Sequence, residues 1–390
     1  MADNNENKVL NVPHLRFPEF IEEWEICKVS ELLDFYSTNS LSWEQLEYGE
    51  KAMMNLHYGL IHVGLPTMVD LRRDKLPNVK EGNMPKNFEL CKEGDVAFAD
   101  ASEDTNEVAK AIEFFNLDNK DIVCGLHTIH GRDNKNKTVV GFKGYAFSSS
   151  AFHNQIRRIA QGTKIYSIST KNFSECYVGI PSKAEQTKIA TLLRLIDERI
   201  ATQNKIIEKL QSLIKGLAAQ LTQSGTPNIR LCDCLECHSS TLQENCVSVT
   251  GSYPVYGATG LIGYTNNYAY NGESILIVKD GSGVGSLSYV NDHFSVIGTL
   301  NYLTAKENYS ILYLYYALMA FNFTPYITGM AIPHIYFKDY GKAKLFYPSI
   351  EKRIRIASLL HNIEQKLVVE QNLVISLSAQ KSYLLRMLFI

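Results

Sequence analysis

The chain has 390 residues, of which 45% are hydrophobic and 21% are charged, and its formal net charge is −2. This length predicts two or three domains, each with its own core. The small net charge argues against a generic polyanion binder, although local basic patches can still bind nucleic acid. Eight cysteines and a polar start (MADNNENK) without an apolar signal segment predict a cytoplasmic chain with reduced thiols. The longest apolar run, ILYLYYALMAFNF (311–323), is too short for a membrane span and predicts a buried helix.

The chain contains one long internal repeat. Residues 180–197 (IPSKAEQTKIATLLRLID) match residues 347–364 (YPSIEKRIRIASLLHNIE) at an offset of 167 positions. A weaker match, KVSELLDF (28–35) with RLCDCLEC (230–237), has an offset of 202 positions. Such a repeat indicates a duplicated domain with its connector, because solenoid repeats have only about 20–50 residues. We therefore predict an α+β fold with a pseudo-two-fold repeat of two globular α/β domains, each followed by a long helix.

After an N-terminal tail (1–16), we expect the first globular domain at 17–181. Its second half is rich in arginine and lysine. The motif HTIH (127–130) leaves three roles open for its histidines: contact with a ligand or DNA, metal binding or general-base catalysis, and a purely structural role. The carboxylates and lysine of DASEDTNEVAK (100–110) have the spacing E-x-x-K, not the E-x-K of nuclease sites, which argues against a nuclease.

We expect the central helix at 182–224. Ser182 and Glu185 form the S-x-x-E pattern of a capping box. Apolar residues then follow the a and d positions of a heptad, which predicts a coiled-coil seam, with an ordinary core helix as the alternative. The predicted seam residues are Leu193, Ile196, Ile200, Gln203, Ile207, Leu210, Ile214 and Leu217.

The second globular domain is expected at 225–348, with strands and glycine-set hairpins. GSGVG (281–285) leads into the strand-like SLSYV, which favours a tight hairpin over a nucleotide loop. CDCLECH (232–238) groups Cys232, Cys234, Cys237 and His238 as a zinc site would. The first copy has no thiol at this position, so we expect cysteines that fill the core and keep zinc as the alternative.

The C-terminal helix is expected at 349–390 and repeats the heptad pattern. Its start has Ser349 with Lys352, so only half of the capping pattern remains. Gln203 and Glu370 share one heptad position, and a polar residue in a seam often fixes register. The predicted seam residues of this helix are Leu360, Ile363, Leu367, Glu370, Val374, Leu377 and Leu384.

These features together resemble the specificity subunits of type I DNA restriction-modification systems. The resemblance rests on VPHLRFPEFIEEWE (12–25), IPSKAEQTKIATLLRLIDERI (180–200), YPVYGATGLIGY with GSGVGSLSY, and GDVAFADASEDTNEVAKA with GLHTIHGR. It covers essentially the whole chain. One departure is Lys352-Arg353, where the family often has Glu-Gln, so the two helix starts are not expected to be identical in role.

The resemblance implies a function without catalysis by this chain. Each globular domain is expected to be a target-recognition domain for one half of a bipartite site in double-stranded DNA. The helices are expected to pair as an antiparallel coiled coil that sets the spacer. Two methylase subunits and the restriction subunits are the implied partners, with no membrane. The chain is expected to bind no cofactor, whereas the partners use S-adenosylmethionine, ATP and magnesium for adenine-N6 methylation or DNA cleavage.

The basic and polar loops supply candidate DNA contacts, since phosphate contacts give affinity and base-edge contacts give sequence specificity. In the first domain we expect His127, Thr128, Arg132, Lys135, Lys137, Arg157, Lys164 and Tyr166. In the second we expect Tyr253, Tyr256, Thr259, Lys279, Ser282, His334, Tyr336 and Lys338.

Two other classes of protein remain as alternatives. A scaffold would join two protein partners through its helices without reading DNA. A metal-dependent enzyme would use His127, His130 or the 232–238 cluster. Sequence-selective DNA binding argues against the first, and a chain without stoichiometric metal argues against the second.

Overall fold

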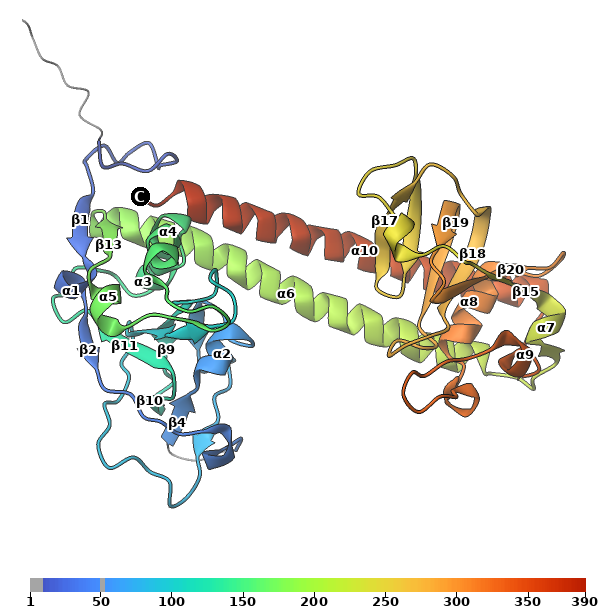
Figure 1. Ribbon diagram of the computed structural model, residues 1–390, viewed down its shortest axis with the longest axis horizontal. Helices are drawn as coiled ribbons and strands as arrows, with labels where there is room; N and C mark the ends of the chain where they lie inside the picture. Colours follow the sequence, from blue (N-terminus) through green and yellow to red (C-terminus); the bar gives the residue numbers. More distant parts are fainter. Residues whose placement is uncertain (1–9, 50–52) are drawn as a thin grey trace, which may run out of the picture. The chain divides into compact units, whose positions relative to one another are not determined.

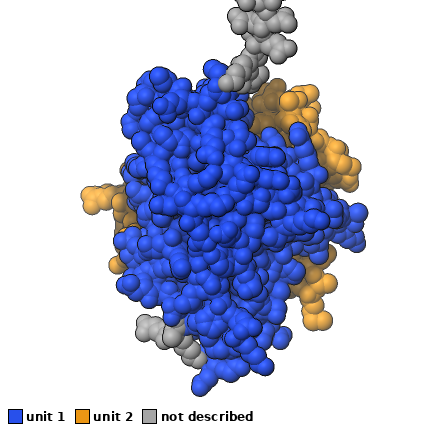
Figure 2. All heavy atoms as spheres, turned by 90° about the vertical axis from the view of Figure 1, so that its left-hand side faces the viewer, with its two compact units in different colours: residues 1–202, 373–390 blue, residues 203–372 orange. Residues whose placement is uncertain are grey.

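The computed structural model describes residues 10–49 and 53–390, and the chain divides into two compact units. Unit 1 extends to Thr202 and includes Leu373–Ile390, and unit 2 is Gln203–Asn372. Figure 2 colours unit 1 blue and unit 2 orange. Each unit thus combines a globular part with a segment of both long helices.

Unit 1 contains a five-stranded sheet in the order β2-β11-β7-β9-β5 and a four-stranded sheet in the order β10-β4-β6-β3. Two small pairs, β1-β13 and β12-β8, complete its strands. The strands are β1 (Glu25–Lys28), β2 (Asp34–Tyr36), β3 (Leu46–Glu47), β4 (Met53–Leu56), β5 (Met68–Asp70), β6 (Asn78–Val79), β7 (Val96–Ala99), β8 (Ala101–Ser102), β9 (Ala111–Asn116), β10 (Asp121–Cys124), β11 (Thr128–Arg132), β12 (Tyr166–Ser167) and β13 (Tyr177–Ile180). The short helices are α1 (Val29–Leu32), η1 (Trp43–Gln45), α2 (Tyr58–His62), α3 (Lys143–Phe147), α4 (Ser150–Ile159) and α5 (Thr170–Ser174).

The core of unit 1 follows from the sequence of β7. Its four residues, VAFA, are all buried, as expected for a central strand covered on both faces. The ring of Phe98 on this strand packs edge-on against Phe147 of α3 at 5.0 Å between centroids. Helix α4 begins where the Ser149 hydroxyl accepts a hydrogen bond from the amide of Phe152. These contacts hold α3 and α4 against the five-stranded sheet.

Unit 2 is built on one six-stranded sheet in the order β15-β20-β18-β19-β16-β17, with a separate pair β14-β21. The strands are β14 (Ile229–Arg230), β15 (Leu235–Ser239), β16 (Tyr253–Gly257), β17 (Gly260–Thr265), β18 (Tyr270–Val278), β19 (Leu287–Val296), β20 (Leu300–Ala305) and β21 (Lys344–Leu345). The short helices are α7 (Leu231–Cys234), η2 (Glu244–Cys246), α8 (Ile311–Met319), η3 (Thr324–Tyr326) and α9 (Phe337–Tyr340). Helix α8 is the predicted buried helix, and it packs on β18 and β19 (Figure 1). The glycine-rich turn at 281–285 leads into β19, as predicted.

The long helices α6 (Lys183–Thr222) and α10 (Ile350–Met387) pair within each unit. In unit 1, Leu193 of α6 shares a core with Leu384 of α10, and in unit 2, Ile214 of α6 shares a core with Leu360 of α10. Because α10 residues with lower numbers pair with α6 residues with higher numbers, the helices are antiparallel. Every predicted seam residue is buried or half-buried.

The internal repeat is visible in strand pairing. Cys27 pairs with Val178 between β1 and β13, and Ile229 pairs with Leu345 between β14 and β21. The two pairs differ by 202 positions on one strand (229 − 27) and by 167 on the other (345 − 178). Both offsets found in the sequence therefore describe the same structural unit, and the predicted α+β fold with an internal repeat is confirmed.

The two helix starts also correspond, despite their different sequences. The Gln186 side chain donates a hydrogen bond to the carbonyl of Pro181 at 2.8 Å. Its counterpart Arg353 donates to the carbonyl of Pro348, also at 2.8 Å. Thus an amide and a guanidinium bind the same backbone position, and the expected difference in role does not extend to this contact.

A tyrosine connects each globular part to its long helix. The Tyr145 hydroxyl donates to the Asp197 carboxylate of α6 at 2.9 Å. In unit 2, the Tyr315 and Tyr316 hydroxyls donate to Glu364 of α10 at 2.8 and 2.7 Å. Asp197 and Glu364 are repeat counterparts, so the same helix position anchors the domain in both copies.

Two local expectations change. Ser182 accepts a hydrogen bond from the Glu185 amide, but the Glu185 carboxylate binds Arg16 through two hydrogen bonds of 2.8 and 2.7 Å instead of closing the capping box. Arg16 therefore packs on the helix and is not part of a free tail, whereas residues 1–9 of the predicted tail lie outside the described residues. The remaining predicted domain boundaries stay predictions.

Within residues 10–49 and 53–390, no helix is both long and apolar enough to span a membrane.

Candidate nucleic-acid interface

Each unit carries a closed loop of the same design beside the end of a central strand. In unit 1, Gln161 and Ser167 exchange two backbone hydrogen bonds, of 2.9 and 2.8 Å, which close the loop between them. The amide of Ile168 then donates to the carbonyl of Asp100, just after β7. Asp100 in turn donates its amide to the carbonyl of His127.

Unit 2 repeats this arrangement. Thr328 and His334 exchange hydrogen bonds of 2.9 and 2.8 Å, and Ile335 donates to the carbonyl of Lys279. The Lys279 amide donates to the carbonyl of Thr299. The loop residues are 167 positions from their unit 1 counterparts, and Lys279 and Thr299 take the places of Asp100 and His127. We call residues 161–167 with Asp100 and His127, and residues 328–334 with Lys279 and Thr299, the paired-loop surfaces.

Glycine is required at the same position in both loops. Gly162 has φ +135°, and a Cβ there would lie 1.9 Å from the carbonyl oxygen of Ile165. Gly329 has φ +90°, and its Cβ would lie 2.3 Å from the oxygen of Ile332. The positive φ and the short distance from a Cβ to the carbonyl oxygen both exclude a side chain at these two positions. The loops present apolar tips, since Ile165 is 62% and Ile332 65% exposed.

The structure brings several predicted residues of the first domain to its paired-loop surface. His127 is exposed, adopts φ +54°, and places Nδ1 3.1 Å from the Asp100 carboxylate. Tyr166 lies on β12, which pairs with β8 directly after Asp100, and Lys164 is exposed in the loop. Arg157 is exposed on α4 and donates to the Asn106 side chain at 2.9 Å.

Two predicted contacts of the first domain are buried. Arg132 is 7% exposed, and its guanidinium binds the carboxylate of Asp95 at 2.8 Å and that of Glu89 at 2.6 Å. The hydrogen bond with Asp95 raises the pKa of Arg132 further above its usual value. Thr128 is also buried, with its hydroxyl donating to the carbonyl of Gly125. These side chains face the core of the sheet, so the structure does not support their role as DNA contacts.

Lys135 and Lys137 lie away from the paired-loop surface. They follow the C-terminal end of β11, whereas His127 precedes its N-terminal end. Lys135 donates to the carbonyl of Glu31, and Lys137 binds the Glu25 carboxylate at 2.6 Å. The predicted basic cluster is therefore split between the two ends of one strand.

In unit 2, the predicted residues form two groups. Lys279 and His334 belong to the paired-loop surface, Ser282 is exposed in the adjoining glycine-rich turn, and Gly281 donates its amide to the carbonyl of Pro333. Lys279 also pairs with Asp280 at 2.6 Å. Beyond the loop, the exposed Tyr336 ring contacts His334 and lies under the Lys338 ammonium.

The second group lies on the β16–β17 hairpin. Tyr253 packs edge-on against Tyr268 and also contacts His293, with centroid distances of 4.9 and 5.6 Å. Thr259 is exposed at the tip of the hairpin. Tyr256 is half-buried against Phe294, and burial raises its pKa. The predicted residues of unit 2 thus fall into a hairpin group (Tyr253, Tyr256 and Thr259) and a paired-loop group.

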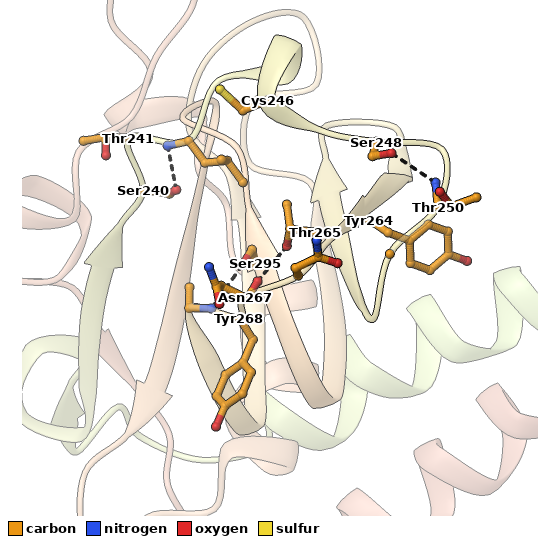
Figure 3. Close-up of a pocket in the computed structure, with 14 residues that line it drawn as sticks. Ser240, Thr241, Cys246, Ser248, Thr250, Tyr264, Thr265, Asn267, Tyr268 and Ser295 are labelled. Atoms are coloured by element: carbon orange, nitrogen blue, oxygen red, sulfur yellow. Dashed lines mark hydrogen bonds between the residues drawn. The ribbon is translucent and has the colours of Figure 1, made fainter.

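A cavity of about 760 Å³ opens at the start of β18 (Figure 3). Ser248, Thr250, Thr265, Asn267 and Tyr268 are among its lining residues, so hydroxyl and amide groups dominate its wall. The amide of Ala269 donates to the Ser295 hydroxyl, which fixes one edge. Such a lining suits polar base edges or sugar hydroxyls more than an apolar ligand.

Aromatic side chains not identified from the sequence adjoin the first paired-loop surface. The rings of Trp43, His57, Tyr58 and His127 form a continuous series with centroid distances of 4.5, 4.7 and 5.2 Å. Burial lowers the pKa of His57, which favours a neutral ring. Trp43 is 45% exposed. These residues are separated by up to 84 positions, and no motif connects them.

The cysteine-rich motif at 232–238 does not gather metal ligands. Cys234 is buried and its thiol donates to the carbonyls of Arg230 and Leu231. The Cys232 thiol donates to the Asp233 carboxylate, and the His238 ring stacks on Tyr302. Among the described residues, Cys232, Cys234, Cys237 and His238 do not form a group of metal ligands. Glu107 and Lys110 of the E-x-x-K pattern form an ordinary ion pair at 2.7 Å.

Comparison with known proteins agrees with the repeated architecture. The sequence matches the type I restriction modification DNA specificity domain over residues 74–212 and 229–377. A 112-residue stretch is 28% identical to the specificity subunit of the type I restriction enzyme EcoprrI of Escherichia coli, and it spans 29% of this chain and 28% of that protein. The chain thus aligns with well under two thirds of that relative's length.

Two solved structures share the fold. The S subunit of a type I restriction-modification system from M. genitalium has a TM-score of 0.65 at 18% identity, with 97% of this chain and 99% of that chain covered. A chain from a study of complex assembly and conformational transition of the type I R-M system has a TM-score of 0.54 at 14% identity, covering 96% and 98%. Two similar α+β domains, each leading into a long helix, define this class of protein.

The family match covers more than half of the sequence and occurs once in each half. The chain therefore belongs to the family of type I restriction-modification DNA specificity subunits and carries two target-recognition domains.

Proposed function

We propose that each target-recognition domain reads one half of a bipartite site in double-stranded DNA, and that the paired-loop surface is its central contact. The observation that carries this proposal is the recurrence of one loop design at the same place in two domains whose sheets differ. A shared loop backbone with different exposed side chains suits two domains that contact the same sugar–phosphate backbone of DNA but read different bases.

The loop tips supply part of the proposed contact. Ile165 and Ile332 are exposed at equivalent positions, where burial of an aliphatic side chain would otherwise be favourable. An apolar side chain can pack against sugars and base edges or enter a base step. Lys164 and His334 belong to the same loops and are proposed phosphate contacts, and the exposed Arg157 of α4 is a further candidate.

The antiparallel helices are proposed to set the spacer between the half-sites. The anchors at Asp197 and Glu364 support this role, because they tie each globular part to a defined helix position. Two quasi-equivalent surfaces also suit two copies of one methylase subunit.

The remaining roles belong to partners in this proposal. The chain recruits methylase and restriction subunits in the cytoplasm, and those subunits use S-adenosylmethionine, ATP and magnesium. The chain itself contributes recognition without catalysis, and adenines move out of the duplex to reach the methylase.

The test is to co-express the chain with its methylase and to map N6-methyladenine by long-read sequencing. A split motif with one methylated adenine in each half is the expected result. A methylase that modifies a motif with another specificity subunit, but none with this chain, would contradict DNA reading and favour a scaffold. A matched Ile165→Ser variant should keep the motif but methylate it more slowly.

A further inference from the structure

Three potential metal ligands meet in the core of unit 1, away from the paired-loop surface. Cys91, Cys124 and His130 each offer a ligand atom, and these atoms lie within 4.8 Å of one another. The two sulfur atoms are 3.6 Å apart. The side chains are at most 5% exposed. Cys124 ends β10 and His130 lies on β11, whereas Cys91 precedes β7 and donates its amide to the carbonyl of Ile122 on β10.

The hydrogen bonds of His130 leave one ring nitrogen available. Nε2 lies 2.7 Å from a carboxylate oxygen of Asp95, which also binds Arg132. A carboxylate accepts, so Nε2 carries a proton, and in the neutral ring Nδ1 keeps its lone pair. Nδ1 is buried and has no hydrogen-bond partner. An unpaired buried acceptor destabilises the folded state, so a group that binds this lone pair would stabilise the domain.

The same arrangement occurs around metal-bound histidines. There the second ring nitrogen donates to a carboxylate, which fixes the tautomer and the ring orientation. Zinc–sulfur bonds of about 2.3 Å in a tetrahedron place two thiolates about 3.8 Å apart, close to the observed separation. A disulfide would need its sulfurs at about 2.05 Å.

We propose that Cys91, Cys124 and His130 bind a structural zinc ion. The charge balance suits a buried site, because one Zn²⁺ and two thiolates sum to zero while His130 stays neutral. Two thiol protons leave to solvent when the ion enters, and no oxidant or reductant is needed. The surrounding residues, including Leu56, Val69 and Phe114, are apolar and would shield the Zn–S bonds from water.

The ion would join the two sheets of the domain. Cys124 belongs to the four-stranded sheet and His130 to the five-stranded sheet. Between them lies the turn of Gly125 and His127, and His127 reaches the paired-loop surface. Zinc therefore holds the base of the His127 turn. In unit 2, no described residues form such a group of ligands.

The experiment uses the full chain in complex with its methylase, expressed with added zinc and purified without chelator or a histidine tag. Mass-spectrometric metal analysis should find about one zinc per specificity chain beyond that of methylase alone. Exchange into Co²⁺ should give a thiolate-to-cobalt charge-transfer band.

Variants locate the site. Cys91→Ser and Cys124→Ser should each lose the metal and the thiolate band, whereas Cys246→Ser, which alters an exposed thiol, should keep both. If the site variants fail to fold, thiol counting on the wild-type complex decides: two more thiols should react after chelation than before. A folded wild-type complex without metal and without a cobalt band overturns the proposal, as does metal retained by the Cys91→Ser/Cys124→Ser chain.

Discussion

The Tyr145 hydroxyl and the Asp197 carboxylate form a 2.9 Å hydrogen bond that attaches the first domain to α6. Asp197 also binds Lys381 of α10 at 2.6 Å, so one carboxylate joins a domain and two helices within unit 1. Burial raises the pKa of Tyr145, which keeps the hydroxyl protonated as the donor.

Removal of this hydroxyl should weaken unit 1. Tyr145→Phe leaves the carboxylate with Lys381 alone, and hydrogen bonds to charged groups contribute about 1.5–3 kcal/mol. We expect a loss of about 1–2 kcal/mol in the free energy of unfolding, measured by urea denaturation. Tyr177→Phe, at an exposed tyrosine, is the control and should change little. Equal effects of the two substitutions would contradict the anchor role.

The buried pair Gln203 and Glu370 should behave as a coupled unit. The Gln203 amide donates to Glu370, which also pairs with Lys366. Gln203→Leu should destabilise the chain by ~2–3 kcal/mol, because a buried carboxylate loses a donor. Gln203→Leu with Glu370→Leu should recover most of that loss, since apolar side chains pack well in a seam. A double-mutant cycle measures the coupling, and purely additive effects would argue against it.

A matched insertion tests the spacer. Seven residues inserted between Asn204 and Lys205, and seven between Val368 and Val369, keep the heptad phase and lie between the anchors Asp197 and Glu364. The added helix is about 10.5 Å long, or roughly three base pairs at ~3.4 Å each. Methylation mapping should show unchanged half-sites and a longer gap. An altered half-site with the original gap would refute the spacer role, and insertion into α6 alone should disrupt activity.

The apolar loop tips should each serve one half-site. Ile165→Ser should lower affinity for the cognate duplex by roughly tenfold, as expected from losing about 1.4 kcal/mol of apolar burial. Ile332→Ser should act similarly through the other half-site. Binding competition with duplexes that are altered in only one half-site therefore distinguishes the effects of the two substitutions. Ile21→Ser, at another exposed isoleucine, is the control. The salt dependence should not change, because no phosphate contact is removed.

His153 and His57 should lower the stability of unit 1 in mild acid. Burial and the nearby Arg157 lower the pKa of His153 below its usual value of 6.5. The unfolded chain then binds protons more readily, so stability is complete above about pH 6.5 and decreases as pH falls through the folded-state pKa. Urea unfolding at about pH 7.5 and about pH 5.5 should show the loss. His153→Gln should reduce it, although His57 contributes in the same direction. A pH profile identical to wild type would contradict this assignment.

Much of the fold could be predicted because the repeat and the heptads are local patterns. The pairs Cys27–Val178 and Ile229–Leu345 follow from offsets visible in the sequence. The apolar run 311–323 does contain a buried helix, α8 (Ile311–Met319), although residues 320–323 lie beyond its end.

The site was less predictable because it is assembled from distant segments. Arg132 is typical of a phosphate contact by residue type, but its strand lies beside Asp95, and the ion pair removes it from solvent. The Trp43, His57 and Tyr58 series depends on how α2 meets the turn at His127. The cysteine-rich stretch that was conspicuous in the sequence is dispersed, whereas Cys91 and Cys124 meet across 33 positions.

Gln203 and Glu370 are 167 positions apart, so each is the other's repeat counterpart. In a symmetric dimer of identical halves, a residue that contacts its own counterpart contacts an identical residue. Two glutamates would repel each other at this position, and two glutamines would lack the negative charge of the carboxylate. One continuous chain permits a donor on one side and a carboxylate on the other. The two helices therefore differ in side-chain chemistry at a position where the repeat makes them face each other.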